Sequence, residues 1–162
     1  MKRSEQQLLD FLKDHNLKIA FAESMTCGMA AMRLGNVSGT SDAFLGSIVC
    51  YDSSVKISLL NVPASMIAKY SAESQQVTDN LARHLTKKMG CDVSAAITGL
   101  AAPGGSETKQ KPVGTIFISV YIKRRLYRKK KKFNGSPEEI KIKTCRELFK
   151  FTLYVLRKNY RK

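Results

Sequence analysis

The chain has 162 residues, with 28 Lys and Arg against 13 Asp and Glu, and a formal net charge of +15 at pH 7. This length suits one domain with a single core, since domains most often contain roughly 100–150 residues. A hydrophobic content of 43% and a charged content of 25% argue against disorder, collagen and coiled coil for the chain as a whole. No apolar run reaches the roughly 18–20 residues of a membrane span, so we expect no membrane association. The amphipathic start, which carries acidic residues, does not look like a signal peptide.

The first helix is expected from Ser4 to about His15, with Ser4 and Gln7 as a capping box. The short apolar run 18–22 predicts a buried strand. Small polar residues follow, and then helix formers continue to Gly35, which predicts a second helix. Residues 44–51 have the composition of another strand. Strand, small-residue turn and helix is the arrangement that points backbone N–H groups at an anion or oxyanion.

The middle of the chain predicts a short helix that Ser54 caps and Pro63 ends. The most regular amphipathic pattern runs from Ser74 to Met89, and Gly90 supplies its C-terminal stop. Residues 92–98 predict a buried strand, and the Gly- and Pro-rich segment that follows predicts a loop.

Residues 113–122 predict the strongest strand of the sequence, and the basic segment after it predicts a turn and an edge strand. Ser136, Pro137 and Glu139 then predict the N-cap, first residue and capping box of a final helix.

Strands and helices alternate without an internal repeat or a long linker. This order predicts a single-domain three-layer α/β/α sandwich over residues 1–162, with a largely parallel sheet. In such folds ligands bind in loops beyond the carboxyl ends of the strands. The loops after Ala22, Tyr51 and Thr98 are therefore the expected site.

Basic charge is concentrated at the C-terminal end. Residues 1–122 contribute only +2 (12 basic and 10 acidic), whereas residues 123–162 contribute +13 (16 basic and 3 acidic). A uniform nucleic-acid-binding domain would not usually be divided in this way. We expect the basic edge strand and final helix to bind nucleic acid only weakly and without sequence preference.

The four cysteines lie far apart and form no CxxC pair, which argues against a zinc knuckle or a disulfide scaffold. We expect four reduced thiols in a cytoplasmic protein. The two histidines, His15 and His84, lie in predicted helices, so a Ser–His–Asp triad and a multi-histidine metal site are poorly supported. The absence of a Walker A sequence and of GxGxxG leaves triphosphate or dinucleotide binding without a motif.

The remaining possibility is catalysis by a side-chain hydroxyl together with a lysine. A lysine ammonium that is removed from water is neutral nearer pH 7, and can then deprotonate a serine while backbone N–H groups stabilise the oxyanion. A tyrosine can relay the proton or orient the lysine. The candidates near the expected loops are Ser24, Thr26, Thr40, Ser41, Tyr51, Ser53, Ser54, Lys56 and Thr98.

Three segments together resemble one family. They are AESMTCG at 22–28, GTSDAFLGSIVCYDSSVK at 39–56 and ITGLAAPGGSETKQKPVGTIFIS at 97–119. The CinA C-terminal domain family, which includes the nicotinamide mononucleotide deamidases, has AESCTGG, GSS followed by YSNEAK, and TGIAGPGG followed by KPVGTV. Order and intervals agree over roughly residues 5–155.

The resemblance implies an amidohydrolase, usually dimeric and needing neither metal nor cofactor, that converts nicotinamide mononucleotide to nicotinate mononucleotide and ammonia. It places Ser41 as the serine that attacks or activates water, Lys56 as its base and Tyr51 as the residue that orients them. The substrate-binding positions that it implies are Ser24, Thr26, Gly28, Thr40, Thr98 and Gly99.

Several positions depart from the family pattern. Met25 and Cys27 replace a cysteine and a glycine, and Cys27 is expected to narrow the pocket. Ala102 replaces a glycine. The segment FNGSPEE has Ser136 and Pro137 where the family has F-x-GDR, whose arginine would suit a phosphate. Lys111 or a lysine of residues 129–132 is the expected substitute.

Three functions therefore compete. The first is the deamidase, with activity weakened by the missing arginine. The second is a catalytically silent CinA-like protein that binds a nucleotide or a partner. The third is a nucleic-acid-associated module that uses the basic C-terminal segment.

Overall fold

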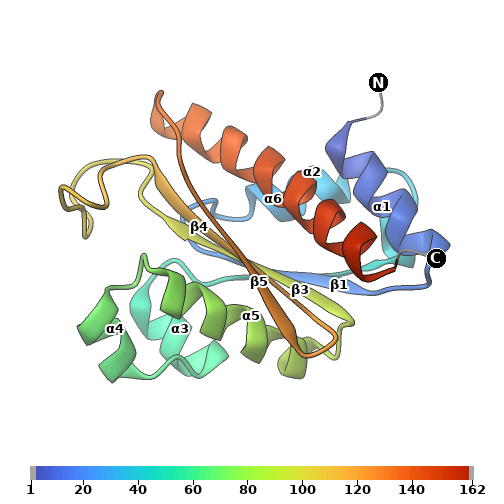
Figure 1. The fold of residues 1–162 in the computed structure, drawn as a ribbon, viewed down its shortest axis with the longest axis horizontal. Helices are drawn as coiled ribbons and strands as arrows, with labels where there is room; N and C mark the ends of the chain where they lie inside the picture. The colour runs from blue at the N-terminus through green and yellow to red at the C-terminus, as the bar shows by residue number, and fades with distance from the viewer. Residues whose placement is uncertain (1–2, 161–162) are drawn as a thin grey trace.

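The computed structural model of the protein describes residues 3–160, which form a three-layer α/β/α sandwich (Figure 1). Its central sheet has five strands in the order β2-β1-β3-β4-β5. The strands are β1 (Ile19–Glu23), β2 (Phe44–Val49), β3 (Val93–Gly99), β4 (Thr115–Ile122) and β5 (Arg125–Lys132).

The predicted largely parallel sheet is confirmed, since four of the five strands run in one direction. Strand β1 pairs in parallel with β2 and β3, whereas β4 pairs antiparallel with both β3 and β5. Parallel neighbours need a long crossover, usually a helix, but antiparallel neighbours do not. Only a loop joins β3 to β4 and a two-residue turn joins β4 to β5, so β4 is reversed.

Helices cover both faces of the sheet (Figure 1). One layer contains α1 (Ser4–Asp14), α2 (Met29–Gly35) and α6 (Pro137–Asn159). The other contains α3 (Ser53–Leu60), α4 (Ala64–Tyr70) and α5 (Gln75–Met89). A short 3-10 helix, Thr40–Asp42, precedes β2.

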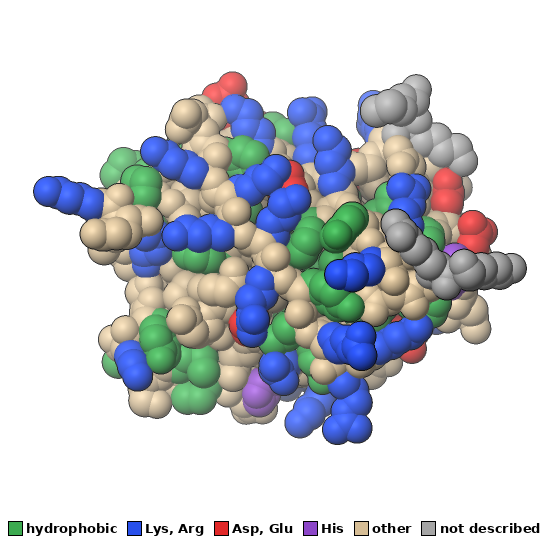
Figure 2. Space-filling model, viewed as in Figure 1, with side chains coloured by type: hydrophobic (Ala, Val, Ile, Leu, Met, Phe, Trp, Pro, Cys, Tyr) green, Lys and Arg blue, Asp and Glu red, His purple; other side chains and the backbone are tan. Residues whose placement is uncertain are grey.

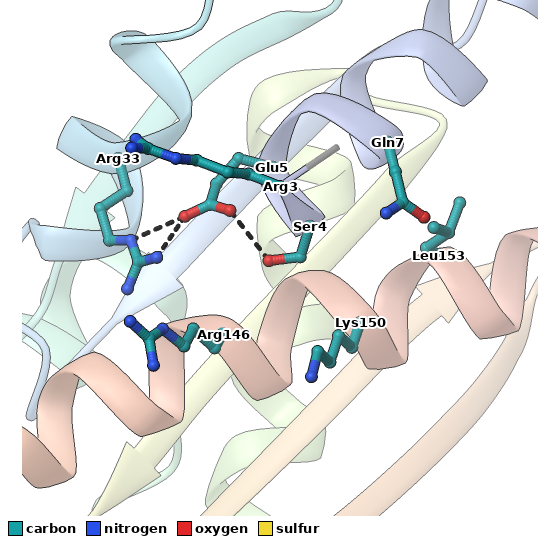
Figure 3. Close-up of a pocket in the computed structure, with 8 residues that line it drawn as sticks. All are labelled: Arg3, Ser4, Glu5, Gln7, Arg33, Arg146, Lys150 and Leu153. Atoms are coloured by element: carbon teal, nitrogen blue, oxygen red, sulfur yellow. Dashed lines mark hydrogen bonds and ion pairs between the residues drawn. The ribbon is translucent and has the colours of Figure 1, made fainter. Parts of the chain in front are cut away.

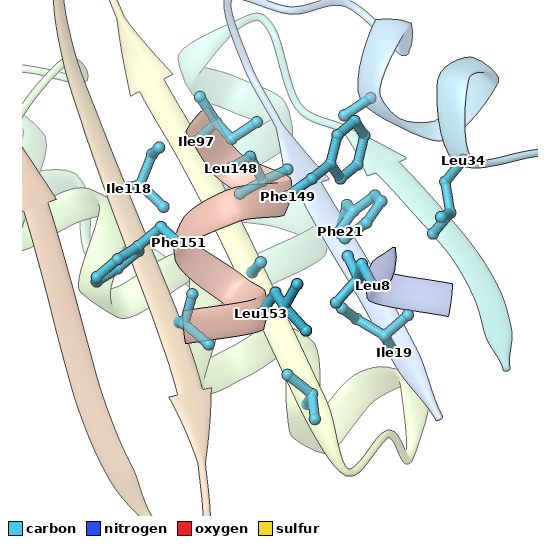
Figure 4. Close-up of a cluster of buried hydrophobic side chains, with 14 of the residues drawn as sticks. Leu8, Ile19, Phe21, Leu34, Ile97, Ile118, Leu148, Phe149, Phe151 and Leu153 are labelled. Carbon is cyan, nitrogen blue, oxygen red and sulfur yellow. The ribbon is translucent and has the colours of Figure 1, made fainter. Parts of the chain in front are cut away.

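The sheet separates two hydrophobic cores because successive side chains of a strand point to opposite faces. On one face Phe21 packs with Phe149 of α6 (Figure 4) and also with Phe44 of β2. On the other face the smaller Ala20 and Ala22 belong to the core beneath α5. Alanines on this face of β1 let α5 approach the sheet closely.

The helix boundaries follow the predicted caps in most cases. Ser136 caps α6 in a complete capping box with Glu139, as predicted. Ser74, where the predicted amphipathic pattern begins, caps α5. The predicted capping box of Ser4 is wrong, because Ser4 is already helical and its hydroxyl donates to Glu5 instead. Asp52, not Ser54, caps α3.

Pro63 ends the α3 region as predicted but also serves as the N-cap of α4, a helix that was not predicted from the sequence.

Within the part of the chain that the structure describes, no helix combines the length and apolarity that crossing a membrane requires.

Candidate functional site

The three predicted loops meet at the carboxyl edge of the sheet, around an open hollow of about 230 Å³. Its walls come from the turn after β1, the segment after β2, the loop after β3 and the first turns of α6. The lining residues are Ser24, Met25, Tyr51, Glu73, the segment 99–105, Pro137 and Lys141. The hollow therefore lies where the sequence predicts the site, and the Ser24 side chain is part of its lining.

Lys56 lies directly behind this hollow with no exposed surface. Its Nζ lies 2.7 Å from the Cys50 carbonyl oxygen and 2.8 Å from the Tyr51 carbonyl oxygen. The third partner is the Ser24 hydroxyl, at 3.1 Å. Lys56 reaches them because α3 begins just after β2, and its side chain extends back toward the ends of β1 and β2.

Burial lowers the pKa of Lys56 below its usual 10.5, because an ammonium loses its hydration inside the protein. A neutral amine has two N–H donors and one lone pair. The two carbonyls match the donors, and the remaining direction points at the Ser24 hydroxyl. The arrangement is suited to removing a proton from Ser24.

Tyr51 contributes to this arrangement through its backbone. Its carbonyl accepts from Lys56, whereas its side chain is 67% exposed and lies at the rim of the hollow. The side chain is therefore placed to contact a bound ligand, and the contact of Tyr51 with Lys56 is made by its main chain.

Ser41 does not meet Lys56, and the predicted pairing of these two residues is wrong. Ser41 lies in the 3-10 helix before β2, exposed to solvent, and neighbouring Thr40 donates to the Leu34 carbonyl oxygen. Because β1 and β2 are parallel, residues before β2 and residues after β1 lie at opposite edges of the sheet. The direction of the strands therefore places Ser24, and not Ser41, at the same edge of the sheet as the Lys56 amine. The positions of the two serines relative to the predicted strands already indicated this in the sequence.

Thr26 and Gly28 serve the turn rather than the hollow. Both donate to one carboxylate oxygen of Glu23, from the Thr26 hydroxyl at 2.8 Å and the Gly28 N–H at 3.1 Å. Glu23 is completely buried and also accepts from Ala30 N, Ala31 N and the Ser47 hydroxyl. Glu23 thus ties the Ser24 turn to both α2 and β2, a role that was not predicted from the sequence.

Two other predicted ligand residues lie elsewhere. Thr98 is fully buried, with its hydroxyl 2.8 Å from the hydroxyl of Thr78 in α5, so it fastens α5 to the sheet. Lys111 donates to the hydroxyls of Ser71 and Ser106 and to the Glu73 carbonyl oxygen, outside the hollow. Neither Thr98 nor Lys111 lines the hollow, and both side chains are engaged in contacts within the protein.

Gly99 does line the hollow, and its position excludes any side chain. A Cβ there would lie 2.6 Å from the Thr115 carbonyl oxygen and 2.9 Å from the Ile116 Cα. Glycine is needed for the close approach of β3 and β4 at this edge. Ala102, which replaces a family glycine, also lines the hollow.

Cys27 does not narrow the hollow, contrary to expectation. Its side chain is exposed and its φ of 48° lies in the left-handed region. A glycine adopts this conformation without strain, which accounts physically for the glycine of the family pattern. Met25 instead lines the hollow and is 3% exposed.

The position of the missing arginine is partly filled from the same helix. Pro137 lies at the wall of the hollow, and Lys141, one turn further along α6, brings an ammonium to that wall.

A larger hollow of about 670 Å³ lies between α1 and α6 (Figure 3). There Arg33 donates to Glu5 and to the Ile142 carbonyl oxygen, an arrangement that holds α1, α2 and α6 together.

Comparison with known proteins agrees with this architecture. A CinA-like protein of Dictyoglomus thermophilum is 41% identical over 140 residues, which are 86% of this chain and 34% of that protein. A CinA-like protein of Prochlorococcus marinus is 37% identical over 85% of this chain and 32% of its own length. The chain thus spans about a third of the curated relatives that it matches.

Solved structures share the whole fold. A CinA superfamily protein from Escherichia coli, 27% identical, aligns with a TM-score of 0.88 over 94% of this chain and 87% of its own. The competence damage-inducible protein A of Klebsiella pneumoniae, 22% identical, aligns with a TM-score of 0.91 over 99% of this chain and 100% of its own. The family model of the CinA C-terminal domain matches residues 1–156. With this match, the chain belongs to the CinA C-terminal domain family.

Proposed function

We propose that the Ser24–Lys56 pair hydrolyses the carboxamide of nicotinamide mononucleotide to nicotinate mononucleotide and ammonia. The observation that carries this proposal is the contact of the buried Lys56 amine with the Ser24 hydroxyl at the floor of the hollow. The substrate follows from the resemblance to nicotinamide mononucleotide deamidases, and the reaction type follows from the serine–lysine chemistry.

In the first half of the reaction, the neutral amine of Lys56 takes the Ser24 proton while Ser24 Oγ bonds to the carboxamide carbon. The tetrahedral intermediate then collapses and its C–N bond breaks. The proton held by Lys56 passes to the departing nitrogen, which leaves as ammonia. The product of this half is an ester between Ser24 and the nicotinoyl group.

In the second half, water attacks the ester carbon as Lys56 accepts a proton from it. The C–O bond to Ser24 breaks, Lys56 returns the proton to Ser24 Oγ, and nicotinate mononucleotide leaves. Backbone N–H groups of the turn after Ser24 are the proposed donors to the oxyanion in both halves. Glu23 holds that turn in place through its bonds to Thr26 and Gly28.

The direct test is to incubate the purified protein with nicotinamide mononucleotide and to measure ammonia and nicotinate mononucleotide. Ser41→Ala provides a matched control, because it removes a serine hydroxyl at the opposite edge of the sheet. Activity that is lost in Ser24→Ala and kept in Ser41→Ala supports the proposal. Activity that survives in Ser24→Ala contradicts it.

A silent nucleotide-binding role is the second candidate, because Pro137 stands where the family arginine would meet a phosphate. The same assay separates the two functions. Saturable binding of nicotinamide mononucleotide by the wild-type protein without release of ammonia would favour the binder.

Lys141 is the proposed phosphate contact. Replacing Lys141 with alanine should raise KM for nicotinamide mononucleotide about tenfold, since a hydrogen bond to a charged group contributes about 1.5–3 kcal/mol and this side chain is half-exposed. The phosphate-free riboside should be processed as before. Steady-state kinetics on both substrates measures the change in preference.

Lys143→Ala is the control, because Lys143 is on the same helix but donates to the Asn134 carbonyl oxygen. An equal loss on both substrates, or none on either, would remove Lys141 from the phosphate site. Pro137→Arg should strengthen binding of the phosphate. It is preferable to Ser136→Arg, because Ser136 is the N-cap of α6 and its replacement would break the capping box.

The basic edge strand is confirmed as β5, but its use stays a prediction. Several of its cations are engaged internally: Arg128 pairs with Asp79, and Lys129 and Lys131 pair with Glu147. Fewer charges are therefore free for a polyanion than the sequence suggests, which accords with weak, salt-sensitive binding. Homodimer formation and a cytoplasmic location also stay predictions.

A further inference from the structure

A second hollow, of about 670 Å³, lies at the opposite edge of the sheet from Ser24. The C-terminal part of α5 forms one wall, and the turn between β4 and β5 forms another. Figure 2 shows Lys and Arg side chains gathered along the lower edge of the molecule, where the turn between β4 and β5 lies in Figure 1. The basic residues that line the hollow are Arg83, His84, Lys87, Lys123 and Arg124.

Positive charge dominates the lining. The single carboxylate, Asp92, already accepts a hydrogen bond of 2.8 Å from the Lys18 backbone N–H. Burial and the nearby Lys87 lower the pKa of His84, so the histidine adds little charge at neutral pH. Two arginines and two lysines therefore face the hollow against one carboxylate.

The turn that supplies two of these cations is strained. Lys123 and Arg124 connect β4 to β5 as a two-residue hairpin, and both have positive φ, 48° and 62°. Such turns strongly favour Asn-Gly, because other side chains are disfavoured in the left-handed region. Two long cationic side chains at these positions reduce stability, and local strain of this kind is often maintained by a functional requirement.

Part of the cluster is held rigidly in advance. Lys123 Nζ donates to the Asn159 carbonyl oxygen at 3.0 Å and lies 3.7 Å from the centre of the Tyr160 ring. The Arg83 guanidinium lies 5.6 Å from the centre of the Tyr121 ring. The Arg124 side chain has no hydrogen bond or ion pair within residues 3–160, so its guanidinium is available to a ligand. Cations that are already positioned lose less conformational entropy when a ligand binds.

We propose that this hollow binds a compact oligophosphate, such as a di- or triphosphate group of a small molecule. The cations stand on two walls, so an anion with several linked charges can contact both, whereas a single carboxylate cannot. The guanidinium of Arg124 offers a planar pair of donors that suits phosphate oxygens. The site is separate from the proposed amidase centre and does not depend on it.

Isothermal titration with inorganic tripolyphosphate tests the proposal on the whole protein. We expect one-to-one binding with a Kd below about 1 mM, weakened by added salt. Arg124→Gln should reduce the affinity about tenfold or more, because it removes a charge-assisted contact. Arg125→Gln is the matched control: it removes the same charge from the next residue, which does not line the hollow. Its effect should be much smaller.

Arg124→Gly adds a second readout that separates a functional residue from a structural one. Glycine relieves the positive φ, so the thermal midpoint of the unliganded protein should rise by about 1–4 °C while tripolyphosphate binding weakens about tenfold or more, as in Arg124→Gln. Equal weakening in Arg124→Gln and Arg125→Gln would show diffuse attraction and overturn the proposal. Absence of binding, or a fall in the midpoint of Arg124→Gly, would also contradict it. Tighter, Arg124-dependent binding of a single-stranded oligonucleotide would assign the face to nucleic acid instead.

Discussion

Ser24→Ala and Lys56→Met should each reduce the release of ammonia from nicotinamide mononucleotide by at least about 10³-fold. The first change removes the nucleophile, and the second removes the only amine that contacts it among the described residues. Residues that act as one catalytic unit typically show losses of this size or larger, and the two losses should not add in the double variant. Ammonia release and circular dichroism together separate lost chemistry from lost folding.

The pH dependence provides an independent check on Lys56. Only the neutral amine can accept the Ser24 proton, so kcat/KM should rise with pH through the pKa of Lys56, which burial places below the usual 10.5. Lys56→Arg should be inactive at every pH, because arginine stays protonated. A pH profile that is flat, or that falls over this range, would show that Lys56 does not act as the base.

Glu23→Gln should destabilise the fold by about 2–4 kcal/mol, even though the two side chains have nearly the same shape. The carboxylate of Glu23 accepts from five groups and is completely buried. A glutamine amide turns one acceptor oxygen into a donor, which then faces the N–H groups of α2 and leaves them unsatisfied. Urea unfolding followed by circular dichroism measures the loss.

Ser47→Ala is the matched control for Glu23, because it deletes only one of the five donors and leaves the carboxylate in place. It should reduce stability by about 1 kcal/mol. If Glu23→Gln proves as stable as the wild type, the carboxylate is not what fastens the turn. The Ser24 turn would then need another explanation for its position.

The sequence alone determined much of this protein. The alternation of strands and helices, the N-cap at Ser136 and the stop at Gly90 are local features, and each is found where the residues predict it. The edge position of β5 followed from its lysines. The three loops that carry the site also followed, because in a parallel sheet all carboxyl ends lie at one edge. The α4 helix was missed because Pro63 both ends one segment and begins the next.

Only the tertiary structure decided which side chains meet. Ser41 is nearer to Lys56 in the sequence than Ser24 is, yet β2 separates them and carries the chain to the other edge. Burial also cannot be inferred from residue type: a lysine is charged and solvated by default, but Lys56 is enclosed because two carbonyls and a hydroxyl surround its amine. A site made from the ends of three strands depends on contacts between distant segments, and those contacts exist only once the sheet has formed.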